Sequence, residues 1–407
     1  MDIMSLKGDF PIFKNIASLV YLDSTATSLK PKSVIEKEVE YYEKYSANVF
    51  RGVYKISEKA TEEYEETREI VAKFISAKKP EEVIFTRSTT ECLNLVAYSM
   101  GRKIVEAGDE IVTTIMEHHS NFVPWQQLAL ENGATFKVID VTDEGYLQIG
   151  NLDQIITKKT KILTLTYVSN VLGTINPLKE IVKTVKSINP KVIVVVDAAQ
   201  AVPHMKVNVQ ELGCDFLAFS SHKMLGPTGV GVLWGRYELL EEMFPFNYGG
   251  EMIQEVYIDR TVFKLPPHKF EAGTPHIAGI VALKEAINYL EKIGMERIRK
   301  HEIEILEYAL NHLLSQFKGM IQILGPNEAR KKSGIIAFTF DKFHPHDVAQ
   351  ILDEDDICIR VGHHCAMPLH ERLTINASCR ASFYIYNSKD DVDKLIKGLH
   401  KVKKTLS

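Results

Sequence analysis

The sequence predicts an α/β protein in which a large lobe with a mostly parallel sheet is joined to a smaller α+β lobe. Between about residues 80 and 235, short β-branched runs alternate with helix-like stretches, and after residue 275 this pattern changes. The length of 407 residues also favours two lobes, because single hydrophobic cores stop growing below about 300 residues.

Six short apolar segments are the expected strands of the large lobe. Apolar strands that are spaced by helices are typical of a parallel sheet covered on both faces. These segments span residues 82–85, 110–115, 161–168, 191–197, 216–221 and 229–235.

The part after residue 275 predicts the smaller lobe. A long amphipathic helix is indicated by Leu306, Leu310, Leu313 and Phe317, which recur at helical spacing. A strand over 334–340, a helix from about Asp347 and an extended segment over 377–386 follow. No Pro/Gly/Ser-rich linker separates the lobes, so the cleft between them is the expected site.

Charge and cysteine usage exclude several classes of function. Lysine plus arginine number 49 against 53 aspartate plus glutamate, so we expect neither nucleic acid nor a membrane as a partner. The first residues lack a signal-peptide core, which predicts a cytoplasmic protein. Five cysteines without a C-x-x-C pair indicate neither a disulfide framework nor a metal site.

Two polar residues follow the apolar run in "VIVVVDAAQ". Asp197 and Gln200 come at the carboxyl end of a buried strand, where open α/β sheets bind ligands. They are candidates for anchoring a small molecule, although an aspartate there can also simply cap the next turn. Lys223, in "FSSHKMLGPTGVGVLWG", follows another strand, where partial burial suits an imine-forming amine. A solvated loop lysine is the alternative.

Two further segments offer polar groups at strand ends. Ser88 to Glu91 match a capping box, and the free N–H groups of that helix start either favour a phosphate or are simply capped. His118 and His119 follow the strand at 110–115. An imidazole there suits stacking on an aromatic cofactor, a surface position or metal binding, but adjacent histidines point apart and a third ligand is missing nearby.

Seven motifs together carry a resemblance. "FTRSTTE", "MEHHSNFVPWQ", "VSNVLGTINP", "DAAQ", "SSHKMLGPTGVG", "FEAGTP" and "RVGHHCAMP" stand in register from "YLDSTATS" to the end of the chain. The sequence resembles the SUF-type, group II NifS-like cysteine desulfurases, which are pyridoxal-phosphate (PLP) enzymes among the class V aminotransferases. The resemblance implies PLP-dependent transferase fold type I. We expect a large PLP-binding domain over 20–290, and a small domain that combines 1–19 with 291–407.

The resemblance also implies the cofactor site. Lys223 is the residue to which PLP attaches, Asp197 pairs with the pyridinium nitrogen, and Gln200 hydrogen-bonds the ring hydroxyl. The resemblance also implies that His118 stacks on the ring and that both His118 and Lys223 are catalytic residues. The implied phosphate ligands are Thr90, Ser220, His222 and, toward the partner subunit of a homodimer, Thr274.

The substrate carboxylate has three implied ligands, Asn170, Arg360 and Arg380. Arg380 also makes sense without the resemblance. In "NASCRASFYIY" the apolar residues Ala377, Cys379, Ala381 and Phe383 alternate, so Arg380 points to the opposite face of a strand. A planar guanidinium there matches a carboxylate with two parallel hydrogen bonds.

The segment "RVGHHCAMP" contains the implied nucleophile, Cys365. Gly362 allows a turn and Pro368 ends it, so a surface loop is expected to let the thiol reach both a buried cofactor and an external acceptor. Nearby histidines favour the reactive thiolate. A lone cysteine is otherwise an inert, buried apolar residue, which is the interpretation for Cys358 in "ICIRV".

The implied reaction converts L-cysteine to L-alanine and leaves a persulfide on Cys365, which passes to a protein sulfur acceptor of the SUF system for iron–sulfur cluster assembly. The alternatives are selenocysteine lyase or another PLP-dependent class V activity, and a non-catalytic scaffold that only binds a partner. The chain departs from the family pattern at Phe50, Tyr54, Ser88, Tyr167 and Ser221. The first two bear on substrate choice and acceptor docking.

Overall fold

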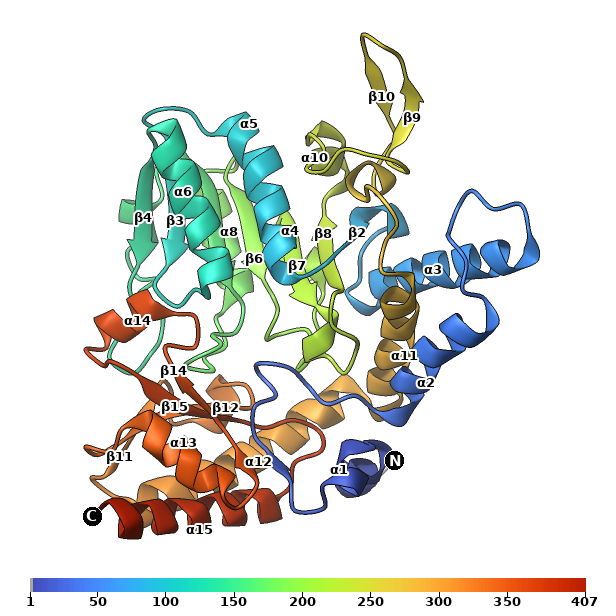
Figure 1. Ribbon diagram of the computed structural model, residues 1–407. Coiled ribbons are helices and arrows are strands. Elements are labelled where there is room, and N and C mark those ends of the chain that lie inside the picture. Colours follow the sequence, from blue (N-terminus) through green and yellow to red (C-terminus); the bar gives the residue numbers. More distant parts are fainter. Residues whose placement is uncertain (1–2) are drawn as a thin grey trace.

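A seven-stranded sheet forms the centre of the large lobe in the computed structural model (Figure 1). The structure describes residues 3–407, with side chains from Leu6 onward. The strand order of this sheet is β2-β8-β7-β6-β5-β3-β4. All neighbouring strands from β7 to β4 are parallel, whereas β8 is antiparallel to both β7 and β2. The strands are β2 (Val83–Thr86), β3 (Glu110–Thr114), β4 (Thr135–Ile139), β5 (Thr160–Thr166), β6 (Ile193–Asp197), β7 (Phe216–Ser220) and β8 (Gly231–Gly235).

The expected α/β class with a mostly parallel sheet is confirmed, and each of the six predicted strands forms. Strand β4, which was not predicted, lies at the sheet edge and has a single fully buried residue, Ile139. Its other side chains are exposed or half-buried, so this strand needs no continuous apolar run.

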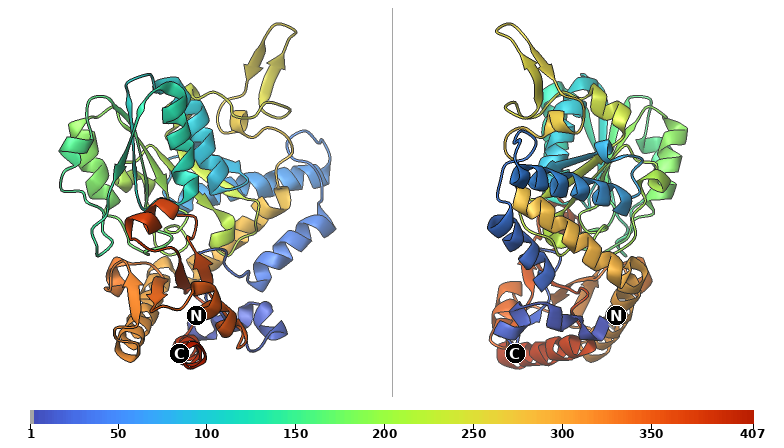
Figure 2. Two further views of the ribbon diagram at one scale, coloured as in Figure 1. Left: turned by 60° about the vertical axis from the view of Figure 1, so that its left-hand side comes forward. Right: turned by 90° about the vertical axis from the view of Figure 1, so that its right-hand side faces the viewer.

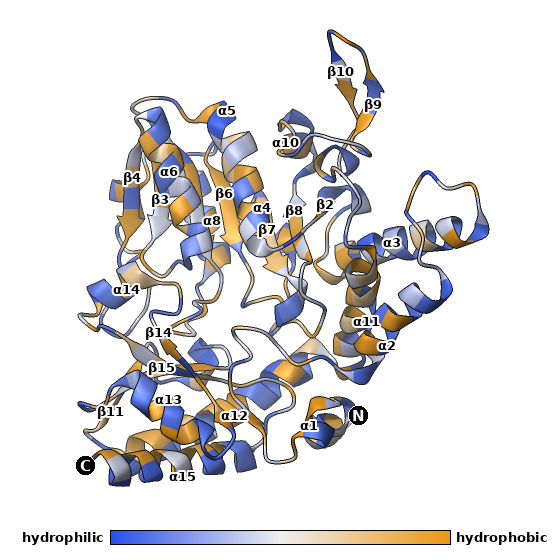
Figure 3. Ribbon diagram, viewed as in Figure 1, coloured by the Kyte–Doolittle hydropathy of each residue, from blue (hydrophilic) through white to orange (hydrophobic). Residues whose placement is uncertain are grey.

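Alternate side chains of the central strands enter two different cores. Val194 and Val196 of β6 belong to one core, whereas Val195 belongs to the other. This two-sided burial explains the unbroken apolar run of β6, and Figure 3 shows the hydrophobic strands between their helices. The longer helices of this lobe are α2 (Lys32–Lys44), α3 (Lys55–Phe74), α4 (Thr89–Val96), α6 (Val123–Asn132), α8 (Leu178–Ile188) and α11 (Ile277–Ile293).

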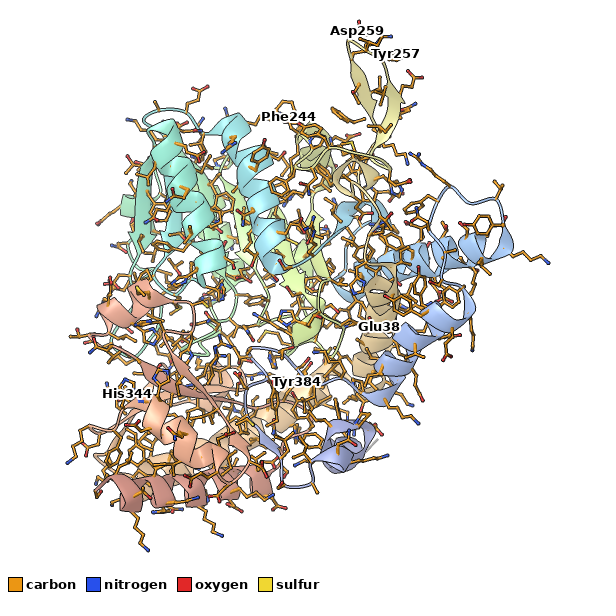
Figure 4. All side chains as sticks on the ribbon, viewed as in Figure 1. Glu38, Phe244, Tyr257, Asp259, His344 and Tyr384 are labelled. Atoms are coloured by element: carbon orange, nitrogen blue, oxygen red, sulfur yellow. The ribbon has the colours of Figure 1, made fainter. Side chains whose placement is uncertain are left out.

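Shorter elements complete the large lobe. A π-helix over Ala97–Gly101 joins α4 to α5, and short 3₁₀ turns over His119–Asn121 and Ser221–Lys223 follow β3 and β7. A hairpin of β9 (Ile253–Val256) and β10 (Thr261–Phe263) projects beyond the lobes in both views of Figure 2, with Tyr257 and Asp259 at its tip in Figure 4. The short helices are α1 (Ile12–Asn15), α5 (Arg102–Ile104), α7 (Leu152–Ile155), α9 (Val209–Leu212) and α10 (Tyr237–Glu242).

The smaller α+β lobe is built on an antiparallel sheet of order β11-β12-β15-β14. Its strands are β11 (Ile321–Leu324), β12 (Ile335–Phe340), β14 (Arg360–Gly362) and β15 (Ser378–Ser382). The predicted leucine stripe lies on a buried face of α12 and packs on this sheet. The helices are α12 (Met295–Gln316), α13 (Pro345–Asp353), α14 (Met367–Arg372) and α15 (Lys389–Leu406).

The two lobes are joined by direct contacts. Tyr384, labelled in Figure 4, follows β15 and donates its hydroxyl to the Pro203 carbonyl of the large lobe at 2.8 Å. The division at residues 20 and 290 stays a prediction, and residues 1–2 lie outside the described residues. Strand β1 (Val20–Tyr21) pairs with β13 (Ile357–Cys358), and Val20 and Leu22 pack in the small-lobe core. This pairing favours a first boundary after Leu22.

No helix in the described part of the chain combines the length and the apolar character that crossing a bilayer requires.

Lys332 places a fully buried amine between the lobes, and replacing it with methionine is expected to stabilise the protein. Its Nζ has no hydrogen-bond partner among the described residues, and burial lowers its pKa to about 7. Since the unfolded chain keeps a pKa of about 10.4, the unfolded state binds the proton more tightly. Stability is therefore lost as pH falls from about 10 to 7 and changes little below.

At pH 7 we expect Lys332→Met to raise the free energy of unfolding by roughly 2–4 kcal/mol, and by less at pH 10. Equilibrium denaturation at both pH values measures this difference. Lys331→Met, a change at the exposed neighbouring residue, is the matched control. An unchanged or lower stability of Lys332→Met would show that the amine is satisfied in solution.

Candidate active site

A cavity of about 200 Å³ lies where the carboxyl ends of the large-lobe strands meet residues of the small lobe. The sheet places the ends of β3, β5, β6 and β7 on one edge, because these strands run parallel. Thr274 is exposed and lines a different hollow, so it alone among the predicted site residues stands apart. The predicted residues that line the cavity are Thr90, His118, Asn170, Asp197, Gln200, Ser220, His222, Lys223, Arg360, Cys365 and Arg380.

Asp197 is the last residue of β6 and is buried. Burial raises the pKa of its carboxyl, while the Ala199 N–H, which donates to Oδ1 at 2.9 Å, and the positive charge of Lys223 oppose that rise. Any cationic N–H placed against this carboxylate would lower the pKa further. Gln200 donates from Nε2 to the Thr25 carbonyl at 2.8 Å, which leaves its Oε1 buried without a partner among the described residues.

Lys223 ends the short 3₁₀ turn that follows β7. Burial lowers the pKa of its amine, and the carboxylate of Asp197 works in the opposite direction. A lowered pKa increases the fraction of neutral amine, which is the form that attacks a carbonyl carbon or takes a proton. Lys223 is therefore a chemically suitable amine, and it lines the same cavity as the buried carboxylate of Asp197.

His118 lines the same cavity as a neutral ring. Burial, supported by the positive charge of Lys223, lowers the pKa of His118 to about 3. Its Nδ1 accepts a hydrogen bond from the Ser120 N–H at 3.1 Å, so the remaining ring proton sits on Nε2. A neutral imidazole with a fixed tautomer is suited to packing against a flat aromatic ligand. Its neighbour His119 turns elsewhere, toward the Cys365 loop.

Hydroxyl groups collect at the N-terminus of α4. Ser220 Oγ accepts from the Thr89 N–H at 2.8 Å and lies 2.6 Å from Thr89 Oγ1, while Thr90 Oγ1 lies 2.7 Å from Ser120 Oγ. Together with His222, whose pKa burial lowers to about 4, these groups can donate to an anion. Hydroxyl donors at a helix N-terminus are the usual surroundings of a bound phosphate.

The capping box at Ser88 is only half formed. Ser88 Oγ accepts from the Glu91 N–H at 3.2 Å, as predicted. The Glu91 carboxylate, however, accepts from the Arg87 N–H at 2.6 Å and not from Ser88. The chain bends before Ser88, so the Arg87 amide comes within reach of the carboxylate first.

Two arginines face each other on the small-lobe side of the cavity. Arg360 of β14 lies directly opposite Arg380 of β15 in the antiparallel register. Burial, together with the charge of Arg360, lowers the pKa of Arg380 to about 10, although Asp23 opposes this effect. Two positive charges in opposed positions repel each other, and an anion bound next to both would relieve this repulsion. Because both arginines line the cavity, the pair favours an anion there.

Arg380 is held in place by two contacts. Its Nη1 donates to the Asn170 carbonyl at 2.9 Å and its Nη2 donates to Asp23 Oδ1 at 3.2 Å, while Nε is buried without a partner among the described residues. The predicted alternation on β15 is confirmed, because Cys379 and Ala381 pack in the core on the other face. Arg380 thus keeps donor capacity for a carboxylate.

Cys365 lies in the loop between β14 and α14 and is half-buried. Among the five cysteines it alone lines the cavity. Its backbone φ of 57° follows a φ of 50° at His364, so two successive residues occupy the left-handed region. The thiol therefore stands on the same cavity as Lys223 and Arg380, and the loop is sharply turned rather than extended.

Of the remaining cysteines, Cys92, Cys214 and Cys379 are buried, and burial raises the pKa of both Cys214 and Cys379 to about 12. The prediction that Cys358 is a buried residue is wrong. It is half-buried in β13, which pairs only with the short strand β1. Burial still raises the pKa of Cys358, which keeps this thiol protonated.

The cavity contains unsatisfied polar atoms, which test whether PLP and an amino acid fit. Four lining side chains each bury one polar atom that has no hydrogen-bond partner among the described residues: Thr25 Oγ1, Gln200 Oε1, His364 Nδ1 and Arg380 Nε. Buried polar groups are normally paired, so this cluster fits a polar ligand. A buried carboxylate, a neutral imidazole, an amine and an anion-binding helix start match the groups of PLP one by one.

Of the departures from the family pattern, Ser88 lines the cavity at the start of α4, whereas the other four lie away from its lining. Phe50 packs edge-on against Tyr64 and His268, and Tyr54 is exposed. The Tyr167 N–H donates to the Asp197 carbonyl at 2.8 Å. This contact uses only the backbone of residue 167, so it supports the buried aspartate with either tyrosine or histidine at that position. Ser221 has a buried hydroxyl without a partner among the described residues.

Several lining or supporting residues were not predicted as site residues, among them Asp23, Thr25, Thr89 and His364. The signal for the first two was the polar run "DSTATS" directly after the apolar "LVYL". The segments that position Arg380 and Asp23 are 357 residues apart, which periodicity cannot connect. In residues 3–407 no group of three or more His, Cys, Asp or Glu side chains is arranged to hold a metal ion.

Comparisons with known proteins agree with this geometry. The aminotransferase class-V family model matches residues 20–395. A probable cysteine desulfurase of Halalkalibacterium halodurans is 50% identical over 406 residues, covering 99% of this chain and 98% of the relative. A probable cysteine desulfurase of Staphylococcus aureus is 49% identical over 409 residues, covering 100% of this chain and 98% of the relative.

Two solved structures are similar over almost their full lengths. The apo cysteine desulfurase of Thermococcus onnurineus has a TM-score of 0.93 at 43% identity, with 98% of each chain covered. The Escherichia coli cysteine desulfurase CsdA, in its S-sulfonic acid form, has a TM-score of 0.92 at 34% identity, with 100% of this chain and 99% of that chain covered. The fold, the cavity and these relatives lead to one conclusion: the chain belongs to the class-V aminotransferase family.

Proposed function

We propose that this protein is a PLP-dependent cysteine desulfurase that converts L-cysteine to L-alanine and receives the sulfur as a persulfide on Cys365. The observation that carries the proposal is a shared cavity. Cys365, Lys223, Asp197 and Arg380 come from four distant segments, and all four line the same space. Relatives that are about half identical over the whole chain are named probable cysteine desulfurases, which agrees with this function.

The residues around the cavity suggest how the cofactor is held. Lys223 would attach it, Asp197 would pair with its ring nitrogen, and Gln200 would bond its ring hydroxyl. His118 would pack on the ring, and the hydroxyl cluster at α4 with His222 would hold the phosphate. When bound, PLP supplies an electron sink for the charge left at the substrate α-carbon.

The protein's own groups would then orient and activate the substrate. Arg380 and Arg360 bind the carboxylate, and Asn170, which contacts both Arg380 and the Cys365 loop, sets its position. Fixing the carboxylate limits where the α-proton and the sulfur can lie. The Lys223 amine takes the α-proton, for which its lowered pKa suits it.

Sulfur transfer would take place at Cys365. Its thiolate attacks the substrate sulfur, so that a sulfur–sulfur bond forms while the carbon–sulfur bond breaks and the bonding electrons pass to the substrate carbon. Protonation of that carbon yields alanine. The half-exposed position of Cys365 then allows an external acceptor to collect the persulfide sulfur.

Several finer points belong to the same proposal. The "GHHC" loop favours the SUF-type branch, with a protein sulfur acceptor that serves iron–sulfur cluster assembly. The position of Thr274, exposed and outside the cavity, suits a contact with the phosphate site of a second subunit in a homodimer. We also propose a cytoplasmic location and a division into two lobes at about residues 22 and 290, where the pairing of β1 with β13 moves the first boundary from residue 20.

The test is to supply the purified holoenzyme with L-cysteine and, separately, L-selenocysteine, and to quantify alanine. We expect one alanine per sulfur released from L-cysteine, together with visible absorbance from bound PLP. Selenium leaves without a thiol nucleophile, so turnover of selenocysteine alone would favour the lyase alternative. A protein that binds no PLP and releases no alanine would support the scaffold alternative and exclude the desulfurase.

A further inference from the structure

Three successive carbonyl groups around Cys365 are each bound by a donor from a different segment. Asn170 Nδ2 donates to the His364 carbonyl at 2.7 Å, and the His119 N–H donates to the Cys365 carbonyl at 2.7 Å. The ring Nδ1 of His370 lies 3.0 Å from the Ala366 carbonyl. This density of contacts matters because His364 and Cys365 both have positive φ, a conformation that non-glycine residues adopt only when their surroundings hold them.

A hydrogen-bond relay leads away from the last of these carbonyls. A carbonyl only accepts, so His370 Nδ1 carries the proton and its Nε2 accepts when the ring is neutral. The Ser378 hydroxyl lies 3.0 Å from this Nε2 and donates to it. Ser378 Oγ in turn lies 3.0 Å from His364 Nε2, which therefore donates to it.

This direction of the relay leaves His364 with an unprotonated Nδ1, which is buried without a partner among the described residues. Burial lowers the pKa of His370, and burial with the nearby Arg380 lowers the pKa of His364 to about 2. Both rings are thus neutral, as the relay requires. The relay starts and ends on the two residues that flank Cys365, and it passes through a buried strand of the small-lobe sheet.

We propose that Ser378 and His370 are positioning residues that, through His364 and Ala366, hold the Cys365 thiol in the geometry for sulfur transfer. This inference rests on the proposed function and extends it to two residues outside the cavity lining. Neither side chain lines the cavity, so we expect the relay to act on the sulfur-transfer step and to leave cofactor binding and substrate binding unchanged.

The experiment compares Ser378→Ala and His370→Asn with the parent holoenzyme. Ser378→Ala removes one oxygen atom, and His370→Asn keeps a donor near the Ala366 carbonyl but loses the acceptor for Ser378. We expect kcat for alanine release to fall about 10- to 100-fold, because a thiol displaced by about 1 Å loses that much rate. KM for L-cysteine and the visible absorbance of bound PLP are expected to stay within about twofold of the parent values.

A second readout is independent of catalysis. Hydrogen–deuterium exchange of the segment 363–369 is expected to be about tenfold faster in both variants, because the contacts that restrain its backbone are weakened. The double variant Ser378→Ala/His370→Asn is expected to lose no more activity than either single variant, since the two residues act as one unit. His400→Gln, at an exposed histidine of α15, is the control and keeps parental values.

The possible results separate clearly. Parental exchange and kcat in both single variants would overturn the relay, and so would loss of PLP binding or of folding, because the residues would then be merely structural. Additive losses in the double variant would overturn the claim that they act together. If the parent enzyme itself releases no alanine, the proposed function fails, whereas faster exchange in the variants would still establish the relay.

Discussion

Replacing Cys365 with alanine is expected to abolish alanine release from L-cysteine while the protein keeps its PLP absorbance. Of the five thiols, Cys365 alone lines the cavity with Lys223 and Arg380, and burial raises the pKa of Cys214 and Cys379 to about 12. These buried thiols cannot substitute as thiolates at neutral pH. Without the nucleophile, turnover should drop about 10³-fold or more.

The measurement is alanine released per enzyme, with persulfide detected by mass spectrometry of the peptide that contains residue 365. Cys358→Ala is the matched control, since it also removes one half-buried thiol but lies outside the cavity. We expect this control to keep both activity and persulfide. Undiminished alanine release by Cys365→Ala would remove Cys365 from the mechanism.

Lys223→Ala is expected to remove the covalent attachment of PLP and to reduce turnover by about 10³-fold or more. The amine combines two roles in one place, cofactor attachment and removal of the α-proton. Both depend on its lowered pKa and on the nearby carboxylate of Asp197. Non-covalent binding through the α4 hydroxyl cluster should persist, because that part of the site is untouched.

Borohydride reduction of the holoenzyme, followed by peptide mass mapping, locates the attached cofactor. We expect the adduct on the peptide containing Lys223 in the parent protein and no adduct in the variant. Lys206→Ala, at an exposed lysine of the same lobe, is the control and should keep the adduct. An adduct on another lysine, or parental turnover in Lys223→Ala, would contradict the assignment.

Many elements of both lobes were predictable because their signals are local. The unbroken apolar run of β6 and the leucine spacing of α12 reflect burial that each segment experiences by itself, and both elements form as expected. The polar residues at strand ends were predictable for the same reason. Parallel strands end on one edge, so Asp197 and Lys223 had to come near each other once the sheet was assumed.

Other features depend on contacts between distant segments. Asp23 gave no sign of its ion pair with Arg380, and β4 lacked the apolar run by which the other strands were found. Cys358 looked like a core residue in an alternating strand, but its only partner is the two-residue strand β1. The alternation of apolar residues predicts which face of a strand a side chain lies on, but it does not predict whether other residues cover that face.

By itself, the sequence predicted the fold class, most strands of the large sheet and many of the residues that line the cavity, Cys365 among them, because motifs and periodicity depend on residues that are close together in the chain. Only the tertiary structure decided that Arg360 stands opposite Arg380 and that His370, Ser378 and His364 form one directed relay. The physical reason is that strand register and hydrogen-bond direction arise from the packing of separate segments, and neither leaves a repeating pattern along the chain.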